Sequence, residues 1–232
     1  MNRQRPRLYL VTPRLDDTAS FAGAIDAALA AADVAAVLLR LAQTDERALI
    51  NRAKTIAATV QRRDIALLLD GRAEIVGRVG ADGAHLTGIE ALTAALGTLK
   101  PDRIAGAGGL RSRHDAMLAA EAGADYVMFG DPLPYLRPHA GEDREGAGRP
   151  SFDAVMERVQ WWAELIELPC VGYAANADEV RPLAQAGADF VALGDWIWTH
   201  PEGAAAAVAA AAASLAKPVP RPVPRPVPRP VP

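Results

Sequence analysis

Cysteine, an excess of positive charge and long apolar runs are all scarce in this sequence of 232 residues. The single cysteine, Cys170, has no partner for an internal disulfide, and a reducing compartment such as the cytoplasm is expected. The net charge is −3, and because the four basic residues of segment 217–232 contribute +4, the remaining residues carry −7. Proteins that bind nucleic acid through its phosphates need a basic surface, and this composition predicts none.

The sequence also lacks a segment that predicts membrane insertion. Its Ala-rich run at residues 203–213 is too short and too weakly apolar to cross a bilayer, and alanine instead favours a helix. The first six residues are charged but are not followed by an apolar core with a cleavage site, so no signal peptide is expected. These absences favour a cytoplasmic globular protein without membrane or nucleic-acid partners.

What the sequence does contain is a regular alternation of short apolar segments and helix-forming segments. Strands are expected at residues 8–12, 35–40, 66–70, 83–87, 103–109, 126–130, 169–173 and 190–195. Helices are expected at residues 17–32, 45–62 (capped by Thr44), 73–79, 89–99, 112–122, 152–166, 177–186 and 203–213. Three strands follow the same Gly-Ala-Asp sequence, which indicates a repeated βα unit. Eight such units predict a single (βα)₈ TIM barrel of the α/β class over residues 1–216, with a doubly wound sheet as the alternative.

The last segment, residues 217–232, has proline at every second position, as Lys-Pro-Val-Pro followed by three Arg-Pro-Val-Pro units. Proline at this spacing prevents helix and sheet hydrogen bonding, so the segment is expected to be disordered or a polyproline II helix. An arginine beside a P-x-x-P pattern could bind an aromatic groove of a partner protein, and a simple extension without a partner is the alternative.

Active sites of TIM barrels lie at the C-terminal ends of the strands. The side chains expected there are those of Thr12, Arg40, Asp70, Thr87, Glu90, Asp131, Tyr173, Asn176 and Asp195, with the glycines Gly108 and Gly109. The connection at residues 131–150 is long and polar, which favours a functional loop. Asp70 ends an apolar run, so it is interpreted either as a metal or substrate ligand or as a cap of the short helix that follows. His85, inside a strand, is expected to form internal contacts.

Four segments of the chain resemble the thiamine phosphate synthase family and its relative, the thiazole tautomerase. They are residues 8–12 (Leu-Tyr-Leu-Val-Thr), 80–86 (Gly-Ala-Asp-Gly-Ala-His-Leu), 123–130 (Gly-Ala-Asp-Tyr-Val-Met-Phe-Gly) and 187–192 (Gly-Ala-Asp-Phe-Val-Ala). The resemblance spans residues 7–213. It implies a TIM barrel that acts in thiamine biosynthesis, as a transferase that joins a pyrimidine pyrophosphate to a thiazole phosphate with Mg²⁺.

The resemblance also implies roles for individual residues. Asp70 and Glu90 stand at the two Mg²⁺-binding positions. Arg40 stands where the family binds pyrophosphate, although Leu38 and Ala42 replace the neighbouring Gln and Lys of the family pattern.

Further departures fall where the family binds phosphate. Arg137 lies in the Tyr-Leu-Arg-Pro sequence at residues 135–138, where the family has Thr-x-Thr-Lys. Residues 174–175, both alanine, replace a glycine pair, and Asp195 replaces a serine. We expect Arg40, Arg137, Tyr173, Asn176 and Asp195 to bind substrate.

Three functions stay open on these residues. The first is thiamine phosphate synthesis, and the second is an acid–base enzyme in which Asp131 replaces the histidine of the tautomerase, with a pKa raised by its apolar neighbours. The third is a non-catalytic family member that binds a thiamine-related ligand or a partner protein. Asp70, Glu90, Asp131 and Asp195 each end a strand or lie just after one. The C-terminal end of the barrel, called the mouth below, is therefore expected to be acidic. It would then bind Mg²⁺ or a cationic, thiamine-like ring better than free phosphate.

Overall fold

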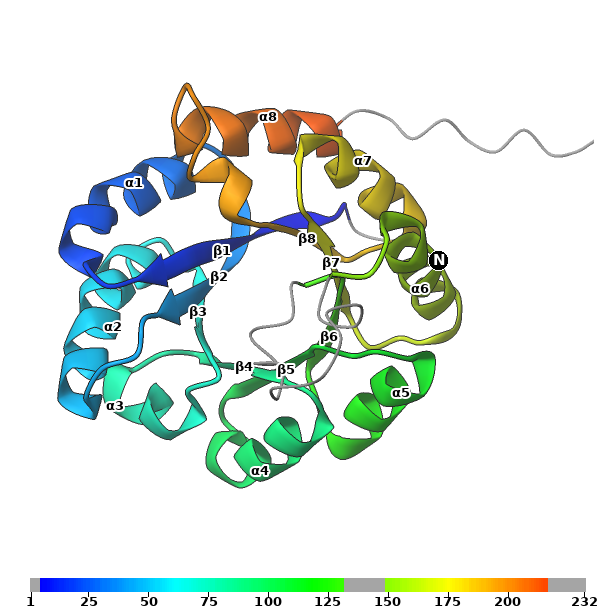
Figure 1. Ribbon diagram of the computed structural model, residues 1–232, viewed down its shortest axis with the longest axis horizontal. Helices are drawn as coiled ribbons and strands as arrows, with labels where there is room; N and C mark the ends of the chain where they lie inside the picture. The colour runs from blue at the N-terminus through cyan, green and yellow to red at the C-terminus, as the bar shows by residue number, and fades with distance from the viewer. Residues whose placement is uncertain (1–4, 132–148, 217–232) are drawn as a thin grey trace, which may run out of the picture.

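The protein is a closed barrel of eight parallel strands surrounded by helices (Figure 1). The computed structural model describes residues 5–131 and 149–216. The strands pair in chain order, and the ring is closed by hydrogen bonding between the last strand and the first, with Leu8 opposite Val191. The predicted TIM barrel is therefore confirmed. The doubly wound alternative is wrong, because an open sheet has no pairing between its terminal strands.

The strands match the apolar segments of the sequence to within one or two residues at most ends. They are β1 (Arg7–Leu15), β2 (Val34–Leu41), β3 (Ala66–Asp70), β4 (Gly83–Thr87), β5 (Ile104–Gly108), β6 (Tyr126–Phe129), β7 (Cys170–Ala174) and β8 (Phe190–Leu193). The first strand extends three residues beyond its expected end, through a register irregularity between Val11 and Arg14.

The helices also follow the expected pattern. They are α1 (Thr18–Ala30), α2 (Glu46–Gln61), α3 (Val76–Val79), α4 (Ile89–Leu99), α5 (Arg113–Ala122), α6 (Phe152–Leu165), α7 (Ala177–Ala186) and α8 (Ala204–Ala216), with 3₁₀ turns at Ala73–Ile75 and Asp195–Ile197. Thr44 was expected to cap α2, but this is wrong. The cap is Asp45, whose carboxylate accepts the Ala48 N–H at 2.9 Å, because the helix starts one residue later.

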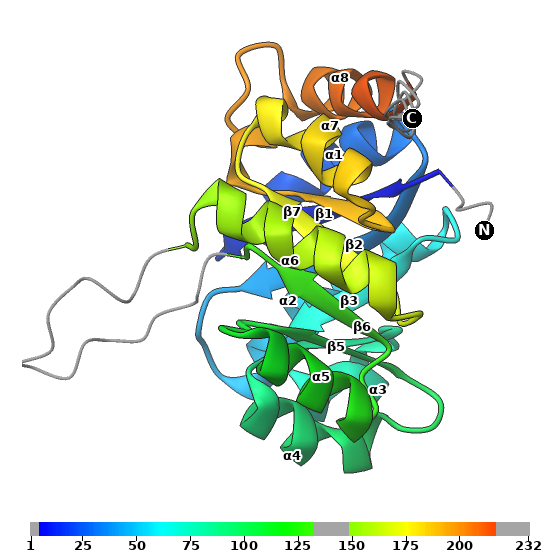
Figure 2. The same ribbon diagram turned by 90° about the vertical axis from the view of Figure 1, so that its right-hand side faces the viewer.

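The buried residues form two groups, one on each face of the barrel wall. The larger group lies between the strands and the helices, and Figure 2 shows α6 and α7 lying across β6 and β7. The smaller group fills the barrel interior and consists of Tyr9, Val11, Ala36, Leu38, Leu68, Tyr126, Met128, Val171, Tyr173 and Ala192. Since side chains alternate between the two faces of a strand, Arg40 lies on the same inner face as Leu38, and Asp70 on the same inner face as Leu68.

Two of the expectations fall on residues outside the described part of the chain. They concern Arg137 in the connection after β6 and the proline-rich segment 217–232. Within the described residues, no helix is long and apolar enough to cross a membrane.

Candidate active site

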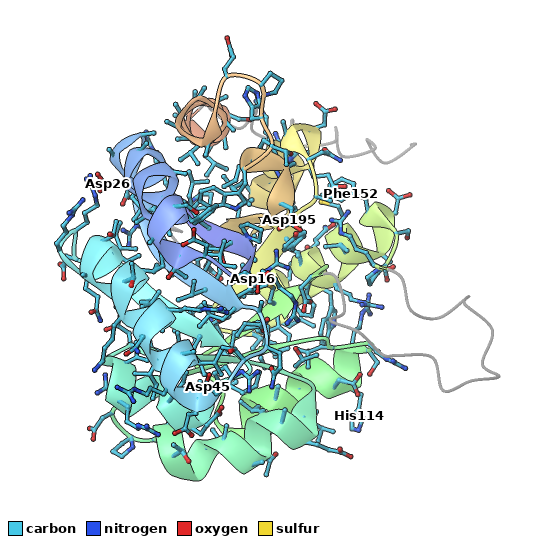
Figure 3. The ribbon with its side chains drawn as sticks, turned by 60° about the vertical axis from the view of Figure 1, so that its left-hand side comes forward. Asp16, Asp26, Asp45, His114, Phe152 and Asp195 are labelled. Carbon is cyan, nitrogen blue, oxygen red and sulfur yellow. The ribbon has the colours of Figure 1, made fainter. Side chains whose placement is uncertain are left out.

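Four of the polar side chains predicted for the mouth lie at or just beyond the C-terminal ends of strands. Asp70 is the last residue of β3, and Arg40 is the last residue but one of β2. Asp131 and Asp195 each follow the end of their strand, β6 and β8, by two residues. Figure 3 labels Asp195 at this end of the barrel, together with Asp16, which follows β1.

Asp70 is a carboxylate held against the barrel interior. Burial raises the pKa of its carboxyl group, while the positive charges of Arg14, Arg40 and Arg72 act in the opposite direction. Asp70 does not cap the turn that follows, because that turn begins after Arg72 and has no side-chain cap. The alternative reading of Asp70 as a helix cap is therefore wrong, and a role at the mouth remains.

Glu90 lies in the first turn of α4, directly after β4, the neighbour of β3 in the barrel. Its side chain is exposed. Among the described residues, no group of three or more histidine, cysteine, aspartate or glutamate side chains is arranged to hold a metal ion. Asp70 and Glu90 are thus two carboxylates on adjacent βα units.

Arg40 is fixed by β1 and paired with Asp195. Its backbone N–H donates to the Thr12 hydroxyl at 2.9 Å, and its Nε donates to the Thr12 carbonyl. Its terminal nitrogen forms a hydrogen-bonded ion pair with the Asp195 carboxylate. The Arg40 side chain is only 15% exposed and that of Asp195 is 61% exposed, so the cation is held in the wall and its partner faces solvent.

Asp131 is the carboxyl group of the mouth whose pKa is raised furthest. Its Oδ2 accepts the Gly109 N–H at 2.9 Å from the neighbouring strand. Although the residue keeps some accessible surface, protein atoms surround its carboxyl group, and this burial raises its pKa to about 7. The negative charge of Asp70 adds to the shift, and the Gly109 N–H opposes it. Near neutral pH, Asp131 can therefore both donate and accept a proton.

Beneath the mouth, three buried side chains form a chain of hydrogen bonds. The hydroxyl groups of Tyr9 and Tyr126 are 2.9 Å apart, and the Tyr126 hydroxyl is 2.9 Å from Nδ1 of His85. Burial lowers the pKa of His85 to about 4, so the imidazole is neutral at pH 7. The expectation that His85 makes internal contacts is confirmed.

Gly108 lies between these hydrogen-bonded side chains and Asp131. A Cβ at this position would lie 2.4 Å from Nε2 of His85 and 2.7 Å from Oδ2 of Asp131. The two polar atoms are therefore no more than about 5 Å apart, a spacing that one bridging water can span. The glycine allows the two groups to approach each other, and no other residue fits here without moving them.

The expected ligand residues on β7 differ in what they contact. Tyr173 lies in the barrel interior, where burial and the negative charge of Asp195 raise the pKa of its hydroxyl group. Asn176 caps α7, since its side-chain oxygen accepts the N–H groups of Asp178 and Glu179. The Asn176 oxygen is thereby engaged by the backbone, whereas Tyr173 faces the space inside the barrel.

Comparison with known proteins adds a family to this geometry. A sequence profile described as thiamine monophosphate synthase matches residues 8–197. The chain belongs to this family. It is 40% identical over 204 residues to thiamine-phosphate synthase from Rhodospirillum centenum, covering 87% of this chain and 94% of that protein. It is 36% identical over 213 residues to thiamine-phosphate synthase from Hyphomonas neptunium, covering 89% and 92%.

Solved structures support the fold of this family member. Thiamine phosphate pyrophosphorylase from Pyrococcus furiosus superposes with a TM-score of 0.72 at 22% identity, covering 92% of this chain and 96% of that one. A 3-hexulose-6-phosphate synthase superposes with a TM-score of 0.65 at 16% identity, covering 90% of this chain and all of that one. At these identities both likenesses concern the barrel alone.

One group of contacts in this family member was missed by the sequence interpretation. Arg149, the first described residue after the β6 connection, forms an ion pair with Glu179 of α7 and donates to the carbonyls of Gly130 and Tyr173. Glu179 is the third residue of α7, three positions after the cap Asn176. That spacing is a sequence signal for a carboxylate that reaches back to the helix start. Nothing in the sequence signals that Arg149 is its partner.

Proposed function

We propose that the protein is a thiamine-phosphate synthase. In this reaction a thiazole nitrogen forms a bond to the methylene carbon of the pyrimidine, and the bond from that carbon to pyrophosphate breaks, with the electron pair leaving on pyrophosphate. The observation that carries the proposal is the match along more than 90% of the length of three relatives, each named thiamine-phosphate synthase. The family match over residues 8–197 includes the C-terminal ends of all eight strands.

The described side chains support binding of an anionic leaving group on one side of the mouth. Arg40 is held by Thr12 at a fixed place in the wall, and such fixed cations stabilise negative charge without rearranging during the reaction. Arg14 and Arg72 act on the same region, because the positive charges of both lower the pKa of Asp70. We assign this side, between β1 and β3, to the pyrophosphate group.

The donor set on this side suits Mg²⁺. This ion prefers oxygen ligands and commonly takes one or two carboxylates, with water and substrate phosphate oxygens as the other ligands. Asp70, with Glu90 on the adjacent βα unit, would supply those carboxylates. The bound ion would neutralise negative charge on the departing pyrophosphate.

Formation of thiamine phosphate by the purified protein tests this assignment. The wild-type protein is expected to form product in a Mg²⁺-dependent way, and Asp70→Asn is expected to lose most of that activity. Glu46→Gln is the control, since Glu46 is exposed at the start of α2 and pairs with Arg78, which has no assigned role at the mouth. Equal loss in both variants would remove Asp70 from the site, and no product from the wild-type protein would refute the function.

A second function, acid–base catalysis on a thiazole, is favoured by one observation, the raised pKa of Asp131 beside the Gly109 N–H. A carboxyl group with a pKa near the working pH is suited to move a proton at neutral pH. The test is isomerisation of a thiazole carboxylate phosphate by wild-type protein and by Asp131→Asn. Turnover that survives in the variant would exclude Asp131 as the acid–base group.

A further inference from the structure

A hollow on the outer surface of the barrel lies between α2 and α3, two helices that are neighbours in the outer ring (Figure 1). It has a volume of about 330 Å³ and is lined by Arg47, Ile50, Asn51, Lys54 and Arg78, and it is called the α2–α3 hollow below. Within the described part of the chain, its lining holds three cations and no carboxylate. None of these residues contributes to the mouth, so the hollow is a separate feature of the molecule.

The sequence of α2 places three polar residues of the hollow on the side of the helix that faces solvent. Arg47, Asn51 and Lys54 are spaced by four and then three positions, so their side chains lie along one face. All three residues are exposed. Leu49 and Ala53, on the other side of the helix, are buried against the barrel. The polar face is therefore free of any packing role.

The positive charges of the hollow are only partly neutralised by the protein. Among the described residues, neither Arg47 nor Lys54 has an ion pair or a side-chain hydrogen bond. Arg78 forms an ion pair with Glu46, and both side chains are more than half exposed. Three cations against one carboxylate leave a local charge of +2, on a protein whose net charge is −3.

The other end of α2 shows a different arrangement of neighbouring cations. Arg62 and Arg63, directly after the helix, both form ion pairs with Asp26 of α1. Like charges that are close together on a helix surface cost stability when no anion lies between them. At the α2–α3 hollow the protein supplies no such anion for Arg47 and Lys54, and a bound anion would relieve the repulsion between the cations.

The lining favours a phosphorylated small molecule. A guanidinium group binds phosphate through two parallel hydrogen bonds, and a lysine adds a compact charge. The Asn51 amide offers both donors and an acceptor, and Ile50, only 8% exposed, adds an apolar surface. The volume lies at the lower end of the range for ligand pockets, roughly 300–1,000 Å³, so it suits a small anion better than a folded partner.

We propose that the α2–α3 hollow is a second anion-binding site, which takes a phosphorylated small molecule through Arg47, Lys54 and Arg78. The site lies on the outside of the barrel, so a ligand bound there does not compete with one at the mouth. The proposal stands on the hollow and its charges and does not depend on the proposed function.

Calorimetry with inorganic pyrophosphate in metal-free buffer tests the site without any need for turnover. The double variant Arg47→Met/Lys54→Met is expected to weaken binding at the hollow about tenfold or more, because each substitution removes a charge that lies next to the anion. Both side chains are exposed and have no ion pair with described residues, so the variant should fold as the wild-type protein does.

A matched control removes the same charge from the end of the same helix. Arg62→Met/Arg63→Met also lowers the net charge by two, but it leaves the lining of the hollow intact. At 0.1 M salt, charges beyond about 10 Å are largely screened, so the affinity should stay within about twofold of the wild-type value. Equal weakening in the two double variants would show a general effect of net charge and would overturn the proposal.

Binding at the mouth is separated by a third variant. Pyrophosphate can also bind near Arg40, so Arg40→Met is measured in parallel. The proposal predicts a binding event that survives in Arg40→Met and is lost in Arg47→Met/Lys54→Met. Binding that Arg40→Met abolishes completely, or no binding by the wild-type protein, would overturn it.

Two further measurements locate the ligand and fix its class. The side-chain amide resonance of Asn51 should shift in NMR spectra as pyrophosphate is added, and saturate at the concentration found by calorimetry. A resonance that does not move would place the anion elsewhere and overturn the proposal. A polyglutamate peptide that binds through Arg47 and Lys54, when pyrophosphate does not, would assign the surface to an acidic protein partner and overturn the ligand class.

Discussion

The guanidinium of Arg40 binds the carboxylate of Asp195 at the mouth of the barrel, and so joins the ends of β2 and β8 across β1. The pair has a direct consequence for the leaving-group side of the site. The cation assigned to pyrophosphate already has an anionic partner, and that partner is largely exposed. An incoming pyrophosphate must share Arg40 with Asp195 or displace it.

Replacement of Asp195 by serine is expected to strengthen pyrophosphate binding. A carboxylate about 4 Å from a phosphate costs roughly 1 kcal/mol in water and 4 kcal/mol near a protein surface, and the exposure of Asp195 places the effect near the lower figure. Asp195→Ser should therefore tighten the binding of the pyrimidine pyrophosphate about fivefold, as measured by calorimetry at low salt. Asp33→Ser, which breaks an exposed pair with Arg7 at the start of β1, is the control. Unchanged affinity in Asp195→Ser would show that pyrophosphate does not contact Arg40.

The buried carboxyl group of Asp131 makes folding stability depend on pH. Its folded-state pKa of about 7 lies above the model-peptide value of 3.8, so the folded protein binds more protons than the unfolded chain between these two values. Stability is therefore expected to fall as pH rises from about 4 to 7, by on the order of 2–4 kcal/mol, and to level off above that range.

Asp131→Asn should remove this loss, because the amide is neutral and its oxygen can still accept the Gly109 N–H. Urea unfolding at pH 4.5 and pH 8 measures the difference. The variant is expected to be more stable than the wild-type protein at pH 8 and to differ less at pH 4.5. The same pH dependence in both proteins would mean that another group titrates.

Gly108 is expected to tolerate no side chain. A Cβ there meets His85 and Asp131 at distances that real contacts do not reach, so Gly108→Ala should destabilise the protein by about 1–3 kcal/mol. Gly97→Ala is the matched control, because Gly97 lies in α4 with nothing within 4 Å of its Cβ position. The control should be neutral or stabilising, as alanine favours a helix. Equal melting temperatures for the two variants would contradict the close approach of His85 and Asp131.

The chain of hydroxyl groups under the mouth predicts an order of effects. Tyr126→Phe removes a hydroxyl group that bonds both Tyr9 and His85, and leaves two buried polar groups without that partner. Tyr9→Phe removes only one hydrogen bond, the one between Tyr9 and Tyr126. Each orphaned buried group costs about 1–3 kcal/mol, so Tyr126→Phe should lower the free energy of unfolding more than Tyr9→Phe. The reverse order in denaturant titrations would contradict the hydrogen bonds that join Tyr9, Tyr126 and His85.

The fold was predictable because each βα unit carries local signals. Strands of a buried parallel sheet are nearly all apolar, so segments such as Ala66–Asp70 could be recognised as strands. The start of α5 could be recognised because its cap, Ser112, directly precedes the helix in sequence. Local signals also placed Asp70, Asp131 and Asp195 at the mouth, since each lies at or just after a strand end.

The contacts between these residues were not predictable from the sequence. Arg40 and Asp195 are 155 positions apart, and Arg149 and Glu179 meet only because β6, β7 and α7 come together at one end of the barrel. The sequence placed Asp195 among the carboxylates that make the mouth acidic, whereas the structure shows that Asp195 forms an ion pair with Arg40. His85 was rightly assigned internal contacts, but its approach to Asp131 depends on Gly108 of another strand.

The most direct test of the proposed function measures both products of one reaction. Purified protein is supplied with the pyrimidine pyrophosphate, the thiazole phosphate and Mg²⁺, and thiamine phosphate and pyrophosphate are quantified together over time. A working synthase should release one pyrophosphate for each thiamine phosphate formed, with both products absent when either substrate is omitted. Release of pyrophosphate without thiamine phosphate, or formation of neither product, would contradict the assignment of this barrel as a thiamine-phosphate synthase.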